Sequence, residues 1–296
     1  MKKVVILHNT KAGDRDLVKS CLINMVSVNN YHTSYYNLRE SKKWTKEINL
    51  ADAIISAGGD GTIRAIVKKI MRKKEIFKLP SLAIFPLGTA NNISKALRRC
   101  GHNNYKNEIN NWRIKSVESL DVGIVHLKNR TNFFLESSGF GLLPLLMYQI
   151  DSSHILDRKS KLIFALKTLY ELTLKAPAND YIIKTENGIY IGKAILVEVA
   201  NSPYIGPNLE ISPSAKLNDG LLDIVVIEDT QRKEFIYYLK NLINGKKSIF
   251  NSKIFKAEKV EISTNEKFFH VDDEIIKVNQ KKIIFELRKN ALNFFS

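Results

Sequence analysis

The stretch Ser56-Ala57-Gly58-Gly59-Asp60-Gly61-Thr62 places three glycines and one acid between an apolar run and a helical pattern. Residues 53–57 are apolar enough to predict a buried strand. Apolar residues then recur at helical spacing, at Ile63, Ile66, Val67, Ile70 and Met71. Glycines let backbone amides approach a bulky anion, and a helix N-terminus presents N–H groups and partial positive charge. The stretch therefore predicts a phosphate-binding turn between a strand and a helix.

The carboxylate of Asp60 adds a second indication, because a bare acid would repel phosphate. It points to a metal ion or to a proton acceptor at the turn. Gly-Gly-Asp-Gly is also common in β-hairpins. A hairpin needs a second strand after the turn, whereas a helical pattern follows here. We therefore favour a nucleotide-phosphate site over a hairpin.

Composition limits the possible classes of protein. The 296 residues correspond to about two domains at roughly 150 residues each, and 44% hydrophobic residues can form a proper core. The two cysteines, Cys21 and Cys100, show no ligand spacing, which fits a reducing cytoplasm. No apolar run has the roughly 20 residues of a spanning helix, and the N-terminal run is too short for a signal peptide. We therefore expect a cytoplasmic protein without a transmembrane segment.

The net charge of +16 indicates an anionic partner, namely a membrane surface, a nucleic acid or a charged substrate. The basic residues are scattered, and no nucleic-acid-binding motif is present, so nucleic acid is the least favoured of these partners. A lysine-rich coding bias on a solvated surface is the alternative explanation.

The first ~125 residues alternate between strand and helix patterns, which predicts an α/β domain with a mainly parallel sheet and helices on both faces. Polar turns follow three of the predicted strands, at Asn9, Gly58 and Gly88. Because ligands bind beyond the carboxyl ends of parallel strands, these turns predict one binding edge.

The pattern changes after Asp121. Short β-prone runs follow, with a strong hairpin signal at Asn187-Gly188 and helices expected near 156–174 and 232–244. The second part therefore predicts a mostly antiparallel β-sandwich or barrel.

Several motifs in this order resemble the diacylglycerol kinase catalytic family, which includes bacterial soluble lipid kinases, sphingosine kinases and ceramide kinases. The resemblance covers nearly the whole chain. The glycine turn alone also fits NAD kinases and phosphofructokinases, and the Gly-Thr-Ala-Asn-Asn turn distinguishes the lipid kinases. The motifs are Gly58–Thr62, Pro86–Asn92, Asp121–Gly123, Asn201–Tyr204, Ser212–Ala215, Asn218–Asp223 and Val271–Glu274.

The resemblance implies two domains: residues 1–125 with 289–296 form an ATP-binding α/β domain, and residues 126–288 form a β-sandwich on the lipid side of a cleft. It implies ATP and Mg²⁺ as cofactors and a lipid hydroxyl as acceptor, most simply that of diacylglycerol, giving phosphatidic acid. It also implies a peripheral protein on an anionic membrane surface, and a homodimer is compatible with the family.

The resemblance also assigns roles to individual residues. Asp272 matches the proposed general base and Glu274 its companion. Asp60 matches an acid that acts through the magnesium of the nucleotide or orients the acceptor. Asp219 and the backbone carbonyl of Leu217 match ligands of a structural metal. The ATP-binding positions are Asn9, Lys11, Gly13, Gly58, Gly59, Gly61, Thr62, Gly88, Thr89 and Asn91.

This chain departs from the family pattern at three places: Thr10 replaces a proline, Asp273 replaces the glycine of Asp-Gly-Glu, and Ile205-Gly206-Pro207-Asn208 stands where the family has two glycines after Pro-Tyr. Two rival functions therefore stay open. One is a kinase of NAD or another small metabolite, and the other is a catalytically silent protein that binds lipid or nucleic acid.

Overall fold

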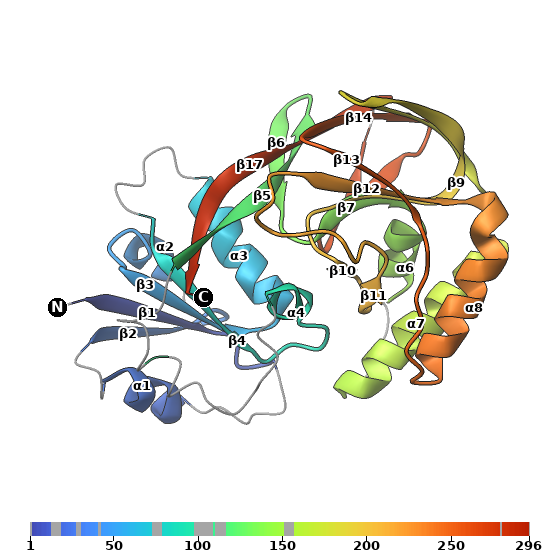
Figure 1. Ribbon diagram of the computed structural model, residues 1–296. Coiled ribbons are helices and arrows are strands. Elements are labelled where there is room, and N and C mark those ends of the chain that lie inside the picture. Colours follow the sequence, from blue (N-terminus) through green and yellow to red (C-terminus); the bar gives the residue numbers. More distant parts are fainter. Residues whose placement is uncertain are drawn as a thin grey trace. The chain divides into compact units, whose positions relative to one another are not determined.

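The computed structural model describes residues 2–12, 19–27, 31–40, 43–72, 79–97, 109, 117–150, 157–278 and 280–295. The chain forms two compact units (Figure 1), and each is described by itself. Unit 1 consists of Met1–Leu120 with Asn290–Ser296, and unit 2 consists of Asp121–Lys289. None of the helices in the described residues is both long and apolar enough to cross a membrane.

Unit 1 is organised around a parallel sheet with the order β4-β3-β1-β2. The last residues of β17 (Lys282–Phe295) extend it by pairing in parallel with β4. The strands are β1 (Lys3–His8), β2 (His32–Asn37), β3 (Ala53–Gly58) and β4 (Ser81–Pro86). The helices are α1 (Lys19–Ser27), α2 (Trp44–Glu47), α3 (Asp60–Met71) and α4 (Asn92–Ala96).

The two faces of this sheet are covered by different helices. Leu22 and Val26 of α1 pack in one cluster with alternate residues of β1, β3 and β4. The intervening strand residues are also buried, and α3 packs on β3 with apolar residues outside that cluster. Figure 1 shows α1 and α3 on opposite sides of the sheet. The predicted α/β class, with helices on both faces, is confirmed.

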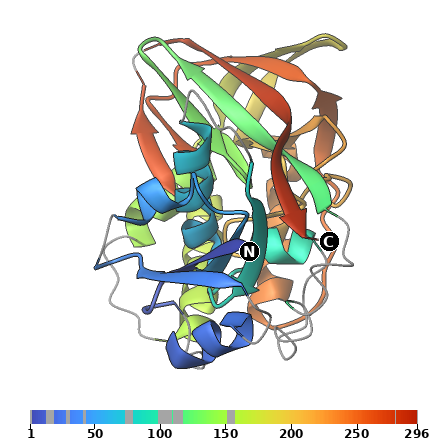
Figure 2. The same ribbon diagram turned by 90° about the vertical axis from the view of Figure 1, so that its left-hand side faces the viewer.

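Unit 2 consists mainly of antiparallel strands, with β9 pairing with β7, β8 and β12. The sheet continues from β7 through β15 to β16, and from β8 through β14 to β17. Two views show β17 as one long twisted strand (Figure 1, Figure 2). The other strands are β5 (Val117–Leu127), β6 (Arg130–Phe134), β7 (Ser137–Gly141), β8 (Asn179–Thr185), β9 (Gly188–Ala200), β10 (Tyr204–Ile205), β11 (Leu209–Glu210), β12 (Leu222–Glu228), β13 (Lys253–Ala257), β14 (Lys259–Thr264), β15 (Phe268–Val271) and β16 (Glu274–Lys277).

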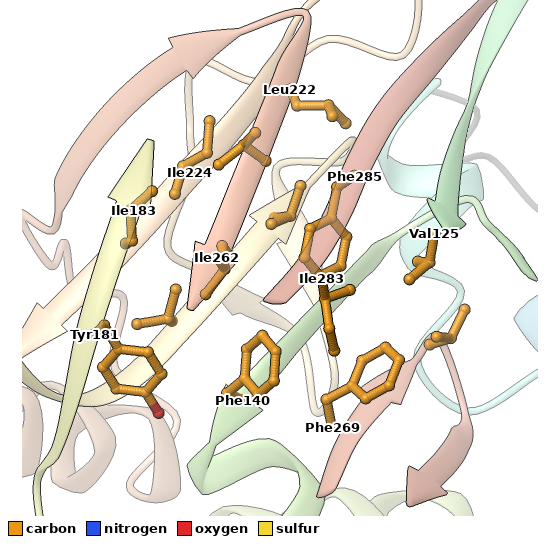
Figure 3. Packing of buried hydrophobic residues seen from close by; sticks show 14 of the residues in the cluster. Val125, Phe140, Tyr181, Ile183, Leu222, Ile224, Ile262, Phe269, Ile283 and Phe285 are labelled. Atoms are coloured by element: carbon orange, nitrogen blue, oxygen red, sulfur yellow. The ribbon is translucent and has the colours of Figure 1, made fainter. Parts of the chain in front are cut away.

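One aromatic core joins these strands. Figure 3 shows Phe140, Phe269 and Phe285 pointing toward one another from β7, β15 and β17. The ring centroids of Phe140 and Phe269 are 5.5 Å apart, within the usual range for aromatic pairs. Because strands from the whole unit contribute to this core, the predicted antiparallel β-sandwich class is confirmed.

A second core lies under three helices of unit 2, namely α6 (Leu142–Ile150), α7 (Arg158–Lys175) and α8 (Arg232–Ile243). The α7 and α8 predictions were correct within a few residues, and the Asn187-Gly188 hairpin forms between β8 and β9. Helix α6 was not predicted, because Pro144 interrupts its apolar pattern. Proline lies here in the first turn of the helix, where its missing N–H has no intrahelical partner to lose.

We expect Phe140→Ala to lower the free energy of unfolding by about 3–5 kcal/mol, because the ring is completely buried and its loss leaves a cavity. Urea unfolding followed by circular dichroism measures this loss. Ile189→Ala is the control, since that side chain is 65% exposed and its truncation should change stability by no more than about 0.5 kcal/mol. Equal midpoints for the two variants would contradict the assignment of Phe140 to the core.

Candidate functional site

The three polar turns predicted at the carboxyl ends of β1, β3 and β4 lie at one edge of the unit 1 sheet. The three strands are adjacent and parallel, so their carboxyl ends share this edge. The Asn9 N–H donates to the Ala57 carbonyl at 2.9 Å, and the Leu87 N–H donates to the Gly58 carbonyl at 2.9 Å. The backbone ladder therefore continues into the turns and fixes where each one begins.

Two of these turns are in direct backbone contact through Gly59 and Gly88. A Cβ atom at Gly88 would lie 2.3 Å from the Cα of Gly59, and one at Gly59 would lie 2.8 Å from the Cα of Gly88. A Cβ atom at Gly58 would lie 2.2 Å from the Oγ1 of Thr62. Glycine is required at these positions because backbone and the first turn of α3 occupy the space of a side chain.

Asp60 connects the same two turns through its carboxylate. The side chain is 8% exposed; Oδ2 accepts the Asn92 N–H at 3.0 Å, and Oδ1 accepts the Ile93 N–H at 3.1 Å. These are the first N–H groups of α4, so Asp60 acts as a cap supplied by another helix. Sequence reasoning assigned Asp60 to a metal or a proton and missed this role in positioning the 88–92 turn.

The side chains of Asn9 and Asn91 form hydrogen bonds that stabilise the turns in which they lie. Asn9 Oδ1 accepts the Lys11 N–H at 3.3 Å, and Asn9 Nδ2 lies 3.5 Å from Thr62 Oγ1. Asn91 adopts a left-handed conformation with φ 53°, and its amide exchanges two hydrogen bonds of 2.9 Å with the backbone of Gly88. Asparagine is among the few non-glycine residues that tolerate this conformation.

The first turn of α3 forms the centre of this edge. Its N-cap is Gly59, and no side chain caps the helix there. Gly61 and the side chains of Lys11 and Thr89 are exposed, so they are accessible to a ligand. Gly13 lies outside the described residues. The arrangement therefore offers a phosphate group backbone amides, a helix N-terminus and one lysine.

His8 ends β1 immediately before Asn9 and is buried. Its Nδ1 lies 2.8 Å from the Tyr35 hydroxyl, and burial lowers the pKa of His8 below its usual value. A neutral imidazole at this position anchors the end of the strand without adding charge to the edge.

In unit 2, the acids at 272–274 form the turn between β15 and β16. Asp272 has φ 51°, whereas Asp273 is not among the residues with positive φ. Aspartate in place of the family's glycine at position 273 therefore imposes no left-handed strain on that residue. The left-handed conformation occurs instead at Asp272, and aspartate tolerates positive φ better than most residues.

The carboxylate of Asp272 is fixed by the junction between β6 and β7. Its oxygens accept N–H groups from Leu135 at 3.0 Å, Glu136 at 2.9 Å and Ser137 at 3.4 Å, while its own N–H donates to the Ser137 carbonyl. Asn201, which the sequence indicated only as part of the 201–204 motif, donates from Nδ2 to the Leu135 carbonyl. The Asp272 carboxylate is thus half-buried with a set direction, whereas Glu274 is exposed.

The loop at 217–223 carries the oxygens expected to bind a structural metal. The Leu217 carbonyl accepts the Asp121 N–H at 2.7 Å, and Asp219 Oδ1 accepts the Leu221 N–H at 3.2 Å. Lys256 places its ammonium 3.6 Å from Asp219 Oδ2. Among the described residues, no group of three or more His, Cys, Asp or Glu side chains could hold a metal ion. Carboxylate and carbonyl oxygens are the usual ligands of hard cations. Here, however, the ammonium group of Lys256 already lies beside Asp219, a contact that the sequence did not indicate.

Comparison with known proteins assigns families to both parts of the chain. Residues 3–125 match the diacylglycerol kinase catalytic domain, and residues 148–294 match the YegS C-terminal NAD kinase beta sandwich-like domain. A diacylglycerol kinase of Bacillus subtilis (strain 168) is 26% identical over 277 residues, covering 90% of this chain and 88% of the relative.

Two solved structures have a similar fold. A diacylglycerol kinase from Bacillus anthracis str. Sterne superposes with a TM-score of 0.69 at 22% identity, covering 99% of this chain and 96% of the other. An NAD kinase from Archaeoglobus fulgidus in complex with ATP gives 0.55 at 14% identity, with coverage of 100% and 94%. At these identities the likeness supports the fold.

We expect Gly88→Ala to weaken nucleotide binding at least about tenfold, because the added methyl group forces the 58–62 and 88–92 turns apart and shifts the backbone amides. Titration with a fluorescent ATP analogue measures the affinity. Ser81→Ala, at the opposite end of the same strand, is the matched control and should bind normally. Unchanged affinity in Gly88→Ala would show that the nucleotide does not depend on these turns.

Proposed function

Since residues 3–125 belong to the diacylglycerol kinase catalytic domain family and residues 148–294 to the YegS C-terminal NAD kinase beta sandwich-like domain family, we propose that the protein is an ATP-dependent lipid kinase. The γ-phosphoryl group of ATP is transferred to a lipid hydroxyl. The acceptor is diacylglycerol and the product is phosphatidic acid, in keeping with the similarity to the diacylglycerol kinase of Bacillus subtilis.

The observation that carries the proposal is the backbone contact between Gly59 and Gly88 at the edge of the parallel sheet. The contact brings the first turn of α3 and the 88–92 turn together, so backbone N–H groups from both turns can face one polyphosphate. Phosphoryl transfer depends mainly on positioning and on charge stabilisation, which such a rigid set of donors supplies.

Each nucleotide residue has a role that follows from its position. Gly58, Gly59 and Gly61 admit the phosphates to the backbone, and Thr62 and Thr89 supply hydroxyl groups. The Lys11 ammonium neutralises phosphate charge, and Asn9, Asn91 and Gly88 keep the turns in place. Asp60 holds α4. It would also act through a nucleotide-bound Mg²⁺, which would supply charge neutralisation to the phosphates.

Asp272 acts as the general base. The acceptor hydroxyl must lose its proton as its oxygen bonds to phosphorus, and a carboxylate within hydrogen-bond reach can accept it. Three backbone amides set the direction of the Asp272 carboxylate, which supports this use because a base needs a fixed position. Glu274 follows on the exposed side of the turn and assists in orienting the acceptor.

Asp219 and the Leu217 carbonyl are proposed ligands of a structural divalent cation. Such an ion would brace the 217–223 loop, where Asp121 Oδ2 also accepts the Gly220 N–H at 2.9 Å. Lys256 already supplies one positive charge at this loop, 3.6 Å from Asp219 Oδ2, so the proposed ion would add to an existing electrostatic contact.

The net charge of +16 supports peripheral binding to anionic membranes, where the substrate resides, and we place the protein at the cytoplasmic side. Nucleic acid is the less favoured partner, and a homodimer is compatible with the proposal.

The test is incubation of the purified protein with radiolabelled ATP, Mg²⁺ and mixed micelles that carry a panel of lipids, with NAD in parallel. We expect label in diacylglycerol and none in NAD. Asp272→Asn should lower kcat by about 10²–10⁴-fold, because an amide cannot accept the proton. The KM for ATP should stay the same, since the nucleotide residues belong to unit 1.

Other outcomes decide between the rivals. Label in NAD without lipid would replace the proposal with an NAD kinase. The Archaeoglobus fulgidus protein with a similar fold is such a kinase. An absence of turnover with every acceptor, combined with tight binding to vesicles or DNA, would establish a silent binding protein.

We also expect the protein to sediment with vesicles that contain anionic phospholipid and to remain in solution with neutral ones. Each basic residue near an anionic surface contributes about 1 kcal/mol, and the attraction weakens as salt shortens the Debye length from about 10 Å at 0.1 M to about 3 Å at 1 M. Equal sedimentation with both vesicle types would refute an electrostatic attachment.

A further inference from the structure

A buried histidine–glutamate pair lies directly behind the Asp272 turn and has no part in the proposed chemistry. His270 of β15 is 3% exposed, and Glu198 of β9 is completely buried. The Nε2 atom of His270 lies 2.9 Å from both carboxylate oxygens of Glu198. On the other side of the ring, Nδ1 lies 2.8 Å from the carbonyl oxygen of Asp272. The imidazole thus joins a buried acid to the turn.

The partners of the ring define its protonation. A backbone carbonyl can only accept, so Nδ1 of His270 must carry a proton. Nε2 faces a carboxylate, and it donates to Glu198 when the ring is an imidazolium. Burial alone would lower the pKa of His270, but the Glu198 carboxylate and the Asp272 carbonyl outweigh burial and raise it. The geometry and the charges therefore both favour the imidazolium form of His270.

The strands around the pair are built to accommodate it. In the sheet, Gly139 of β7 lies opposite both His270 and Glu198. A Cβ atom at Gly139 would lie 2.5 Å from the Glu198 carboxyl carbon, so only glycine leaves room for this acid. Next to it, the Ser138 hydroxyl donates to the His270 carbonyl at 2.6 Å. Three strands thus fix the pair.

The charged neighbours of the pair are few. Helix α6, which packs on β15, and strand β7 carry no charged residue. Strand β16, which pairs with β15, carries Glu274 and Lys277, and both are exposed. Glu198 and Asp272 are the acids that act on His270. Glu198 also acts on Tyr181, whose pKa is raised chiefly by burial and then by Glu266. The proton balance at the pair is therefore set mainly by its own two members.

We propose that His270 and Glu198 are positioning residues that hold the Asp272 carbonyl, and with it the 272–274 turn, in the geometry for phosphoryl transfer. The proposal rests on the lipid-kinase function above. The turn needs such support because Asp272 has positive φ. Its carboxylate and N–H are held by the 135–137 junction, and His270 supplies the hold on its carbonyl.

The pair makes the turn sensitive to a rise in pH above 6.5. The folded-state pKa of His270 is raised above 6.5, so the stabilisation is fully present below pH 6.5 and is lost as pH rises through the folded-state value. A neutral ring has one N–H for two acceptors, so either the Asp272 carbonyl or the Glu198 carboxylate is left facing a lone pair. The turn then loses its support, and kcat falls while ATP binding in unit 1 is unaffected.

Glu198→Gln is the decisive variant. The glutamine amide can donate to Nε2 of a neutral His270, whose Nδ1 still donates to Asp272, so both contacts survive without a charge. We expect kcat at pH 7 within about threefold of wild type and an alkaline fall in kcat that is absent or moved up by at least about one pH unit. His270→Ala should lower kcat about 10–100-fold at an unchanged KM for ATP, since small misplacements of a base are costly.

The chain offers a matched control in a second pair, His126 and Glu286, which lie 2.6 Å apart with side chains 40% and 37% exposed. His126→Ala should leave kcat and its pH profile unchanged. If His270→Ala does not fold, the thermal midpoints of wild type and Glu198→Gln across pH 6–10 replace it. The wild-type midpoint should fall at alkaline pH, and that of Glu198→Gln should not.

Two results would overturn the proposal: an identical alkaline limb of kcat in Glu198→Gln, or a His270→Ala protein that is less stable but keeps full kcat. A protein that labels no acceptor would refute the lipid kinase. In that case the midpoint-against-pH comparison still decides whether the pair supports the turn, because it needs no substrate.

Discussion

Two backbones that approach closely enough to exclude any side chain determine the geometry of the sheet edge at which we propose that the nucleotide binds. Gly59 and Gly88 follow neighbouring parallel strands, and their contact sets the distance between the first turn of α3 and the 88–92 turn. The other features of the edge depend on this distance. The Asp60 carboxylate reaches the α4 amides across it, and Asn91 closes its own turn against Gly88. Loss of one glycine therefore disturbs a whole network of hydrogen bonds.

Acids in both units bind backbone amides and so stabilise loops, in addition to any role in catalysis or metal binding. Asp60 caps α4, Asp272 binds the 135–137 junction, and Asp121 binds Gly220. A buried carboxylate is stable only when such donors replace water. Removing one of these acids therefore tests catalysis and loop geometry together. Variants that keep the acceptor but change the charge separate the two roles better than truncation to alanine.

The sequence predicted the fold class because its signals are local. The 53–57 run, the glycine turn and the spacing from Ile63 to Met71 specify a strand, a turn and α3 without reference to the rest of the chain. The Asn187-Gly188 hairpin formed for the same reason. The missed helix α6 shows the limit, since its nine residues contain no charged residue and lack the alternation that identifies a surface helix.

The site was predictable in its residue types and less so in its contacts. The motifs indicated Asp272 and Asp60, but not that both carboxylates bind amides far away in sequence. Glu198 gave one signal, as a single acid within the apolar run 194–200, yet its partner lies 72 residues away.

The positions of the two tryptophans have a practical consequence. Trp44, which begins α2, and Trp112 both fall within residues 1–120. Intrinsic tryptophan emission is thus an unlabelled optical reporter of unit 1, and changes confined to unit 2 leave no tryptophan of their own to observe.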